Sequence, residues 1–169
     1  MSGPVLPPLP AEILTSGPLR VAEEWIDLYG HMNMARYVAL FDEVGYALQE
    51  RWGLGESYTR ETRMGLFVVD VAISYRRELT AGTPLTLALR LLEADDKRLV
   101  SLMELRRGDD GTLAATMEQL SIHADLTTRR VVPFAPPAAR RLRTLAEHHA
   151  GLPLPDGFRR RLRCRPPAD

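Results

Sequence analysis

The residues best suited to chemistry lie close together, between positions 25 and 37. Asp27 supplies a carboxylate that can attack an electrophilic carbonyl or activate a water molecule. Asn33 has the side chain of a helix N-cap, and an apolar helical periodicity begins just after it. The unpaired amides at a helix start carry partial positive charge, which suits an oxyanion forming on a carbonyl. This segment therefore holds both halves of an acyl-transfer site.

His31 lies between these two residues, and its role stays open at the level of sequence. It fits a loop histidine bonded to the backbone, a partner that orients Asp27, or part of a coenzyme or acyl pocket. Asn33 has a similar ambiguity, because a structural cap at this position would also shape a site for an oxyanion.

Asp70 is unusual because it interrupts a run of valines and alanines in a predicted strand. Such a carboxylate must be paired, exposed or used. If the substrate is cationic, Asp70 could balance its charge while a ring such as Tyr29 or Phe67 offers a π face. The alternative is an exposed or interfacial Asp70 with the aromatic rings in the core. Asp42 fits a rim or salt-bridge residue, with positioning of a water as the alternative.

The remaining histidines and the single cysteine do not indicate a metal centre. His123 and Asp125 share one face of a predicted strand, but no third ligand accompanies them. The pair at positions 148 and 149 falls in a polar helix and is predicted to be solvated. Cys164 is the only cysteine, so no intrachain disulfide can form, which suits a reducing cytoplasm.

The elements that would position these residues follow from periodicity. Apolar residues recur at steps of three and four between positions 34 and 52, which predicts one long amphipathic helix that ends at Gly53 and Gly55. Alternating or β-branched character predicts five strands, and a basic segment predicts a short second helix. The strands are expected at residues 19–26, 65–78, 85–91, 99–105 and 112–123, and the second helix at 136–150. One apolar helix stripe against one antiparallel sheet is the economical α+β packing.

Composition bounds the remaining possibilities. With 169 residues, 45% hydrophobic and 26% charged, the chain is the size of one domain. We expect a proline-rich arm at 1–13, a domain at 14–130 and a C-terminal helix with an arginine-rich tail at 131–169. The formal net charge of zero gives no global attraction to nucleic acid or to anionic membranes. No signal sequence or membrane-spanning run is evident, which favours a cytoplasmic protein. The tail could reach RNA or coenzyme A phosphates, but a solvated, mobile tail is the commoner case.

Asp27, Gly30 and Tyr37, together with the element order, resemble the hotdog-fold thioesterases of the 4-hydroxybenzoyl-CoA thioesterase type. In that family a strand leads to an Asp, a glycine follows three residues on, and a tyrosine of the central helix follows ten on. The resemblance covers roughly residues 17 to 125. It implies a hotdog fold in which the sheet wraps around the central helix.

The resemblance also implies roles for individual residues. Asp27 would be the catalytic carboxylate, and the backbone amide of Met34 would polarise the thioester carbonyl. His31 and Asn33 would support that centre. The acyl and coenzyme groups would contact the remaining candidates, which are Tyr29, Gly30, Tyr37, Phe67 and Asp70. The implied reaction is hydrolysis of a small or polar acyl-CoA without metal or other cofactor, coenzyme A being part of the substrate.

A narrower resemblance is to the betainyl-CoA thioesterases of carnitine breakdown. It is carried by short segments at 30–33, 92–98, 113–118 and 123–125, with the arginine and proline-phenylalanine pairs that follow them. The family places acyl-CoA sites between subunits, so a homodimer or homotetramer is implied. Two other readings stay open: a hydratase or dehydratase on the same fold, using His31 with Asp27, and a non-catalytic acyl-CoA-binding protein.

Overall fold

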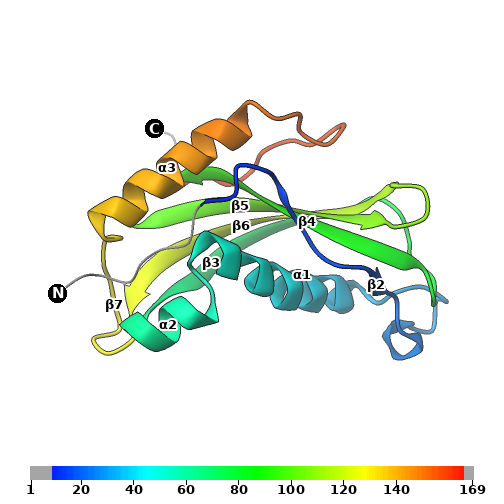
Figure 1. Ribbon diagram of the computed structural model, residues 1–169. Coiled ribbons are helices and arrows are strands. Elements are labelled where there is room, and N and C mark those ends of the chain that lie inside the picture. Colours follow the sequence, from blue (N-terminus) through cyan, green and yellow to red (C-terminus); the bar gives the residue numbers. More distant parts are fainter. Residues whose placement is uncertain (1–8, 166–169) are drawn as a thin grey trace.

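The computed structural model describes residues 9–165 and has one seven-stranded antiparallel sheet with a long helix against one face (Figure 1). Along the sheet the strands follow the order β1-β4-β5-β6-β3, which leaves β3 at an edge with β6 as its only neighbour among the described residues. The four long strands are β3 (Met64–Tyr75), β4 (Pro84–Ala94), β5 (Arg98–Arg107) and β6 (Leu113–Asp125). They confirm the four strands predicted after the central helix.

The central helix is α1 (Met34–Gln49), followed by a single 3-10 turn, η2 (Glu50–Trp52). Asn33 caps α1, as predicted: its side-chain oxygen accepts a 2.9 Å hydrogen bond from the amide of Ala35. Gly53 ends the helical segment in a left-handed conformation with φ 74°. The buried face of α1 packs on β4 and β5. Gly45 allows that close approach, because a side chain there would collide with Met103 of β5.

The predicted strand at 19–26 is wrong in extent. This part of the chain makes two short ladders with β4, β1 (Leu14–Thr15) and β2 (Leu19–Arg20), and then turns into a 3-10 segment, η1 (Glu23–Trp25). Pro18 lies between the two ladders and has no amide to donate, which interrupts the pairing. Leu14 is nonetheless fully buried, so the first ladder belongs to the core.

A β-bulge in β3 decides which of its side chains face α1. Val68 pairs with Ser121 and Asp70 pairs with Leu120, so Val69 has no partner in β6. The extra residue reverses the alternation, and both Val68 and Val71 face α1. The unbroken alternation predicted for this strand is therefore wrong at its centre.

The C-terminal part packs against the sheet. Helix α3 (Pro136–Ala150) matches its predicted range and packs along β4. The prediction of a solvated pair at 148 and 149 is wrong for His149, which is buried and accepts a hydrogen bond from the amide of Leu91 of β4. The segment at 153–165 then crosses the sheet face opposite α1 (Figure 1). There the amides of Arg161 and Leu162 donate to the carboxylate of Glu118, which is only 1% exposed. The expectation of a mobile, solvated tail is therefore wrong for this segment, because backbone and ion-pair contacts fix it. Residues 1–8 and 166–169 lie outside the described part.

Two small elements were not predicted: the helix α2 (Glu56–Thr62) and the two-residue strand β7 (Arg130–Val131). Within residues 9–165, no helix is both long and apolar enough to cross a membrane. A sheet wrapped around one long helix, with a short C-terminal helix beside it, is the α+β hotdog arrangement that the sequence resemblance implied.

Candidate active site

The loop between η1 and α1 is a tight, hydrogen-bonded turn that carries Asp27. The Asp27 carbonyl accepts from the amide of Gly30 at 3.0 Å, and the Asp27 amide donates to the carbonyl of His31 at 3.0 Å. Gly30 has φ 82°, a conformation in which a Cβ is strained, so glycine is the residue that this turn requires. The amide of Met32 donates to Leu79 at 2.7 Å, which ties the loop to the chain between β3 and β4.

The carboxylate of Asp27 lies at the start of α1. Its Oδ1 accepts from the amide of Tyr29 at 2.9 Å, and its Oδ2 lies 3.5 Å from the side-chain nitrogen of Asn33, a long hydrogen bond. Asn33 thus contacts the carboxylate with one side-chain atom and caps the helix with the other. The cap residue is the direct structural link between the acid and the helix terminus.

The amide of Met34 is the first N–H of α1 and has no acceptor within the described residues. Asn33 satisfies the amide of Ala35 through its side chain and that of Arg36 through its carbonyl, at 2.9 Å each. The helix start therefore keeps a free, partially positive N–H on the residue after Asn33, whose side chain contacts the Asp27 carboxylate. A carbonyl oxygen placed there would meet a hydrogen-bond donor.

Two tyrosines hold the end of β3 against the start of α1. Tyr75 donates to the carbonyl of Met34 at 3.2 Å, and Tyr37 donates to the carbonyl of Arg77 at 3.3 Å. Their rings meet edge to face at 5.2 Å. Tyr37 is buried, and this burial raises the pKa of its hydroxyl to about 12. Tyr37 is therefore a buried residue that supports the site, and its side chain does not lie at the surface of the site.

An open, mainly apolar groove of about 520 Å³ runs from the start of α1 along the exposed inner side of β3. Met34 and Val38 form one wall, and Val68 and Val71 form the other. Its lining residues include one carboxylate, that of Asp42, and no lysine or arginine. The groove has the shape and polarity to receive an acyl group whose carbonyl lies at the Met34 amide.

Not all candidate residues come together. Ser74 contacts the C-terminal segment, which crosses the sheet face opposite the groove. Because alternate residues of a strand point to the same face, Asp70 lies on that opposite face as well. Phe67 pairs with Ile122 on that same opposite face and lies under the guanidinium of Arg129, 5.2 Å from its ring centre. The bulge separates both residues from Asp27 within this chain.

The histidines differ in their surroundings. His31 stacks on Tyr29 with ring centres 6.2 Å apart, and its Nδ1 lies 3.3 Å from the carbonyl of Met32. His123 is enclosed: Tyr58 contacts one ring nitrogen at 2.8 Å and the carbonyl of Val132 the other at 3.0 Å. Both ring nitrogens of His123 are thus engaged in structural contacts. Within the described part, no group of three potential metal ligands is found.

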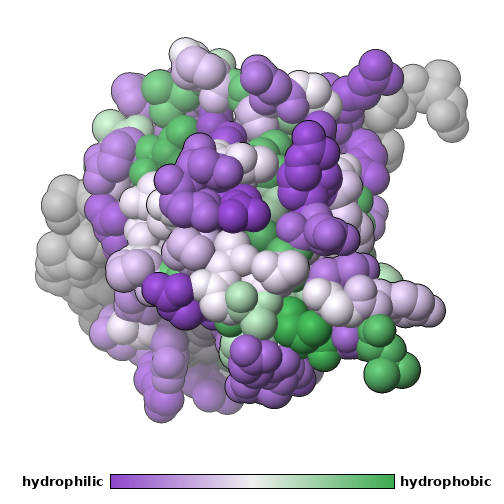
Figure 2. Space-filling model, turned by 90° about the vertical axis from the view of Figure 1, so that its right-hand side faces the viewer, coloured by the Kyte–Doolittle hydropathy of each residue, from purple (hydrophilic) through white to green (hydrophobic). Residues whose placement is uncertain are grey.

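The loop presents large apolar side chains to solvent. Leu28 is fully exposed, and Tyr29 is 85% exposed. Figure 2 views the end of the molecule where the loop lies and shows hydrophobic side chains protruding from a mixed surface. Tyr75 and Gln119 were not predicted as site residues, yet Tyr75 fixes the helix start and Gln119 lines the groove. Both looked like ordinary strand positions, and only the sheet register brings them to α1.

The chain is similar to several known proteins. A betainyl-CoA thioesterase from Pseudomonas aeruginosa is 30% identical over 150 residues, which cover 89% of this chain and 94% of that protein. An L-carnitine dehydrogenase/betainyl-CoA thioesterase from Rhizobium meliloti is 33% identical over 84% of this chain, but the match spans only 29% of that longer protein. A Staphylococcus aureus protein, SAV2348, solved in complex with CoA, superposes with a TM-score of 0.76 at 24% identity, covering 96% of this chain and 100% of the other.

The family model of the thioesterase-like superfamily matches residues 21–142, which include the loop that carries Asp27, α1 and the four long strands. This match covers well over half of the chain. The chain therefore belongs to the thioesterase-like superfamily.

Proposed function

We propose that the protein hydrolyses an acyl-coenzyme A thioester to a free acid and coenzyme A. The observation that carries the proposal is the placement of the Asp27 carboxylate beside Asn33, the cap of α1, next to the free amide of Met34. A thioester carbonyl bound between them would have an acid on one side and an oxyanion donor on the other. Membership of the thioesterase-like superfamily supports the same reaction.

The reaction needs only water and the thioester. The oxygen of a water molecule bonds to the acyl carbon, the bond from carbon to sulfur breaks, and the thiolate takes up a proton to become free coenzyme A. Asp27 serves either as the base that removes a proton from that water or as the nucleophile whose acyl anhydride the water then cleaves. The Met34 amide stabilises the oxyanion in either route. We propose that no further cofactor takes part, so chelators should leave the rate unchanged.

We propose a small, cationic acyl group, with betainyl as the first candidate. The relatives named betainyl-CoA thioesterase support this choice. The groove supports it independently, because its single charged lining residue is Asp42. A carboxylate favours a positive charge in the groove and disfavours an anionic acyl group. Asp70, which the sequence suggested for this role, lies on the other face of the sheet.

We propose that two copies of the chain pair through β3 to form a homodimer. A homotetramer that uses the same surfaces is the alternative. This edge strand leaves its outer backbone groups unpaired within the described chain, and it exposes Val68, Val69, Val71 and Tyr75 by 42% to 53%. Such an apolar edge needs a partner. Pairing there would place the second copy over the open side of the groove. A cytoplasmic location fits the single, buried and unpaired Cys164.

The test is a thiol-release assay over betainyl, short aliphatic, long aliphatic and aromatic acyl-CoAs. We expect hydrolysis with preference for the cationic acyl group, and Asp27→Asn should lower kcat by about a hundredfold or more while the fold is kept. Glu147→Gln is the matched control, because it removes an exposed carboxylate from the C-terminal helix α3. Full activity in Asp27→Asn would reject the assignment, and equal rates for neutral and cationic acyl groups would reject the substrate class.

A further inference from the structure

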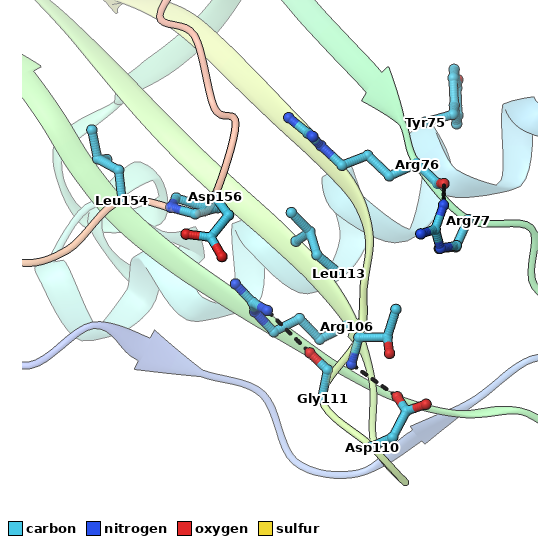
Figure 3. A pocket seen from close by; sticks show the side chains of 11 residues that line it. Tyr75, Arg76, Arg77, Arg106, Asp110, Gly111, Leu113, Leu154 and Asp156 are labelled. Carbon is cyan, nitrogen blue, oxygen red and sulfur yellow. Dashed lines mark hydrogen bonds between the residues drawn. The ribbon is translucent and has the colours of Figure 1, made fainter.

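A second pocket lies at the end of β3, close to the start of α1 (Figure 3). It has a volume of about 700 Å³, which is in the range of small-molecule sites. Its walls come from the end of β3, the turn between β5 and β6, and the C-terminal loop that holds Leu154 and Asp156. Tyr75 lines this pocket and also donates to the carbonyl of Met34, so the pocket begins where the proposed oxyanion site is fixed.

Three arginines and two aspartates, Asp110 and Asp156, line the pocket, and two of the arginines make no ion pair within the described chain. Arg106 is ion-paired with Glu104, whose carboxylate also pairs with the buried Arg90. Within the described chain, Arg76 and Arg77 make no ion pair and bond only to the carbonyls of Gly157 and Arg76, respectively. Adjacent guanidinium groups that make no ion pair repel each other and favour a bound anion.

The side chain of Arg76 is held in place by the C-terminal loop. Its Nη2 donates to the carbonyl of Gly157 at 3.0 Å, while its Nε is buried without an acceptor in the described structure. Gly157 has φ 69°, and a Cβ there would come within 3.2 Å of the Arg76 guanidinium. The loop is therefore shaped around this arginine and holds its guanidinium group at the pocket wall.

The other lining groups fit a nucleotide. The exposed apolar side chain of Leu154 and the ring of Tyr75 offer surfaces for a base, and the carboxylate of Asp156 points toward the cavity between the arginines (Figure 3). A carboxylate can accept from ribose hydroxyls or from an amino group of a base. A simple phosphate would not use these neighbours.

From these contacts we infer that the pocket binds the phosphorylated nucleotide end of the coenzyme A thioester, with Arg76 and Arg77 contacting its phosphates. This inference rests on the proposed function, because it assumes that a thioester lies at Met34. Coenzyme A would then run from the Met34 amide around the end of β3 at Tyr75 to the arginines, because Arg76 contacts the C-terminal segment on the sheet face opposite α1. The C-terminal segment, through Gly157, becomes part of the substrate site.

The kinetic test compares a full acyl-CoA with the N-acetylcysteamine thioester of the same acid, which lacks the nucleotide. The single variant Arg77→Ala and the double variant with Arg76→Ala should each raise KM for the acyl-CoA by about tenfold or more, which is the size expected for losing a charge-assisted contact. In both variants kcat should change little. KM for the truncated thioester should stay the same. Arg77→Lys should recover part of the loss. Arg140→Ala, an exposed arginine of α3, is the control.

Equal changes in KM for both thioesters, or no change for either, would overturn the inference. A binding test separates it from the hydrolysis itself. Adenosine 3′,5′-bisphosphate should bind the inactive Asp27→Asn protein in a calorimeter and should bind the double arginine variant at least about tenfold more weakly. Failure of hydrolysis in every assay, with this binding intact, would reject the proposed reaction alone. Equal displacement by inorganic phosphate at the same concentration would show a plain anion site and reject the nucleotide.

Discussion

Tyr75 donates a 3.2 Å hydrogen bond to the carbonyl oxygen of Met34 and thereby joins the last residue of β3 to the first residue of α1. Met34 is the first residue of α1, and its free amide is the proposed oxyanion donor. The strand edge, the helix start and the pocket of Arg76 and Arg77 therefore meet at one tyrosine.

Tyr75→Phe should remove this link and keep the ring. A net hydrogen bond contributes about 1 kcal/mol, so we expect kcat to fall by about fivefold if the helix start loses its position. Tyr46→Phe on the exposed side of α1 is the matched control and should leave kcat unchanged. Steady-state kinetics on both variants checks the prediction, and an unchanged kcat in Tyr75→Phe would show that the bond does not position the amide.

Substitutions of Asn33 should separate its two roles, which are to cap α1 and to contact Asp27. Asn33→Ala loses the cap and should lower the free energy of unfolding by about 1 kcal/mol, together with a lower kcat. Asn33→Ser keeps a capping oxygen but has no nitrogen to contact Asp27, so stability should largely return while kcat stays low. Chemical denaturation and kinetics measure the two effects. Recovery of both in Asn33→Ser would mean that the contact with Asp27 is not used.

Gly30→Ala should cost about 1 kcal/mol of stability, because its φ of 82° strains any residue with a Cβ. No atom lies within 4 Å of the position that the new Cβ would take, so the cost is in the backbone alone. Gly17→Ala also meets no atom, and the residue has no positive φ, so it should be neutral or slightly stabilising. Thermal melts compare the pair. Equal stability of the two variants would contradict the backbone explanation.

Two buried histidines should make the fold less stable in mild acid. Burial lowers the pKa of His123 and of His149 below the ordinary value of 6.5. As pH falls below that value, the unfolded chain takes up protons that the folded chain does not, so the free energy of unfolding decreases until the folded pKa is reached. Melting temperatures between pH 8 and pH 5 should therefore decline toward acid. The decline should be smaller in His149→Gln, but unchanged in His148→Gln, whose histidine is exposed. Equal slopes in both variants would contradict the assignment.

Local signals in the sequence were sufficient for the elements that depend on near neighbours. The cap at Asn33, the stop at Gly53 and the range of α3 follow from side-chain types and short periodicities, and the structure confirms them. The first strand was less predictable, because its two short ladders depend on where β4 offers free backbone groups and on the interruption at Pro18.

The faces of β3 could not be predicted, because one unpaired residue at the bulge moves Asp70 to the opposite side from the groove. Alternation along a strand is a local rule, but a bulge arises from register with β6, a neighbour distant in sequence. The same is true of the C-terminal arginines. Their sequence indicated a solvated tail, whereas the buried carboxylate of Glu118 and the carbonyl of Gly157 show where the segment binds.

By itself, the sequence determined the loop with its aspartate, the helix that starts after it and the α+β class, since turns, caps and periodicities act over a few residues. Tertiary structure decided which side chains share a face, that Tyr75 meets Met34, and that an arginine pocket opens beside them. These features depend on strand register and on contacts between segments that are distant in sequence. The stabilising energy comes from pairs of distant residues, which a local sequence pattern does not contain.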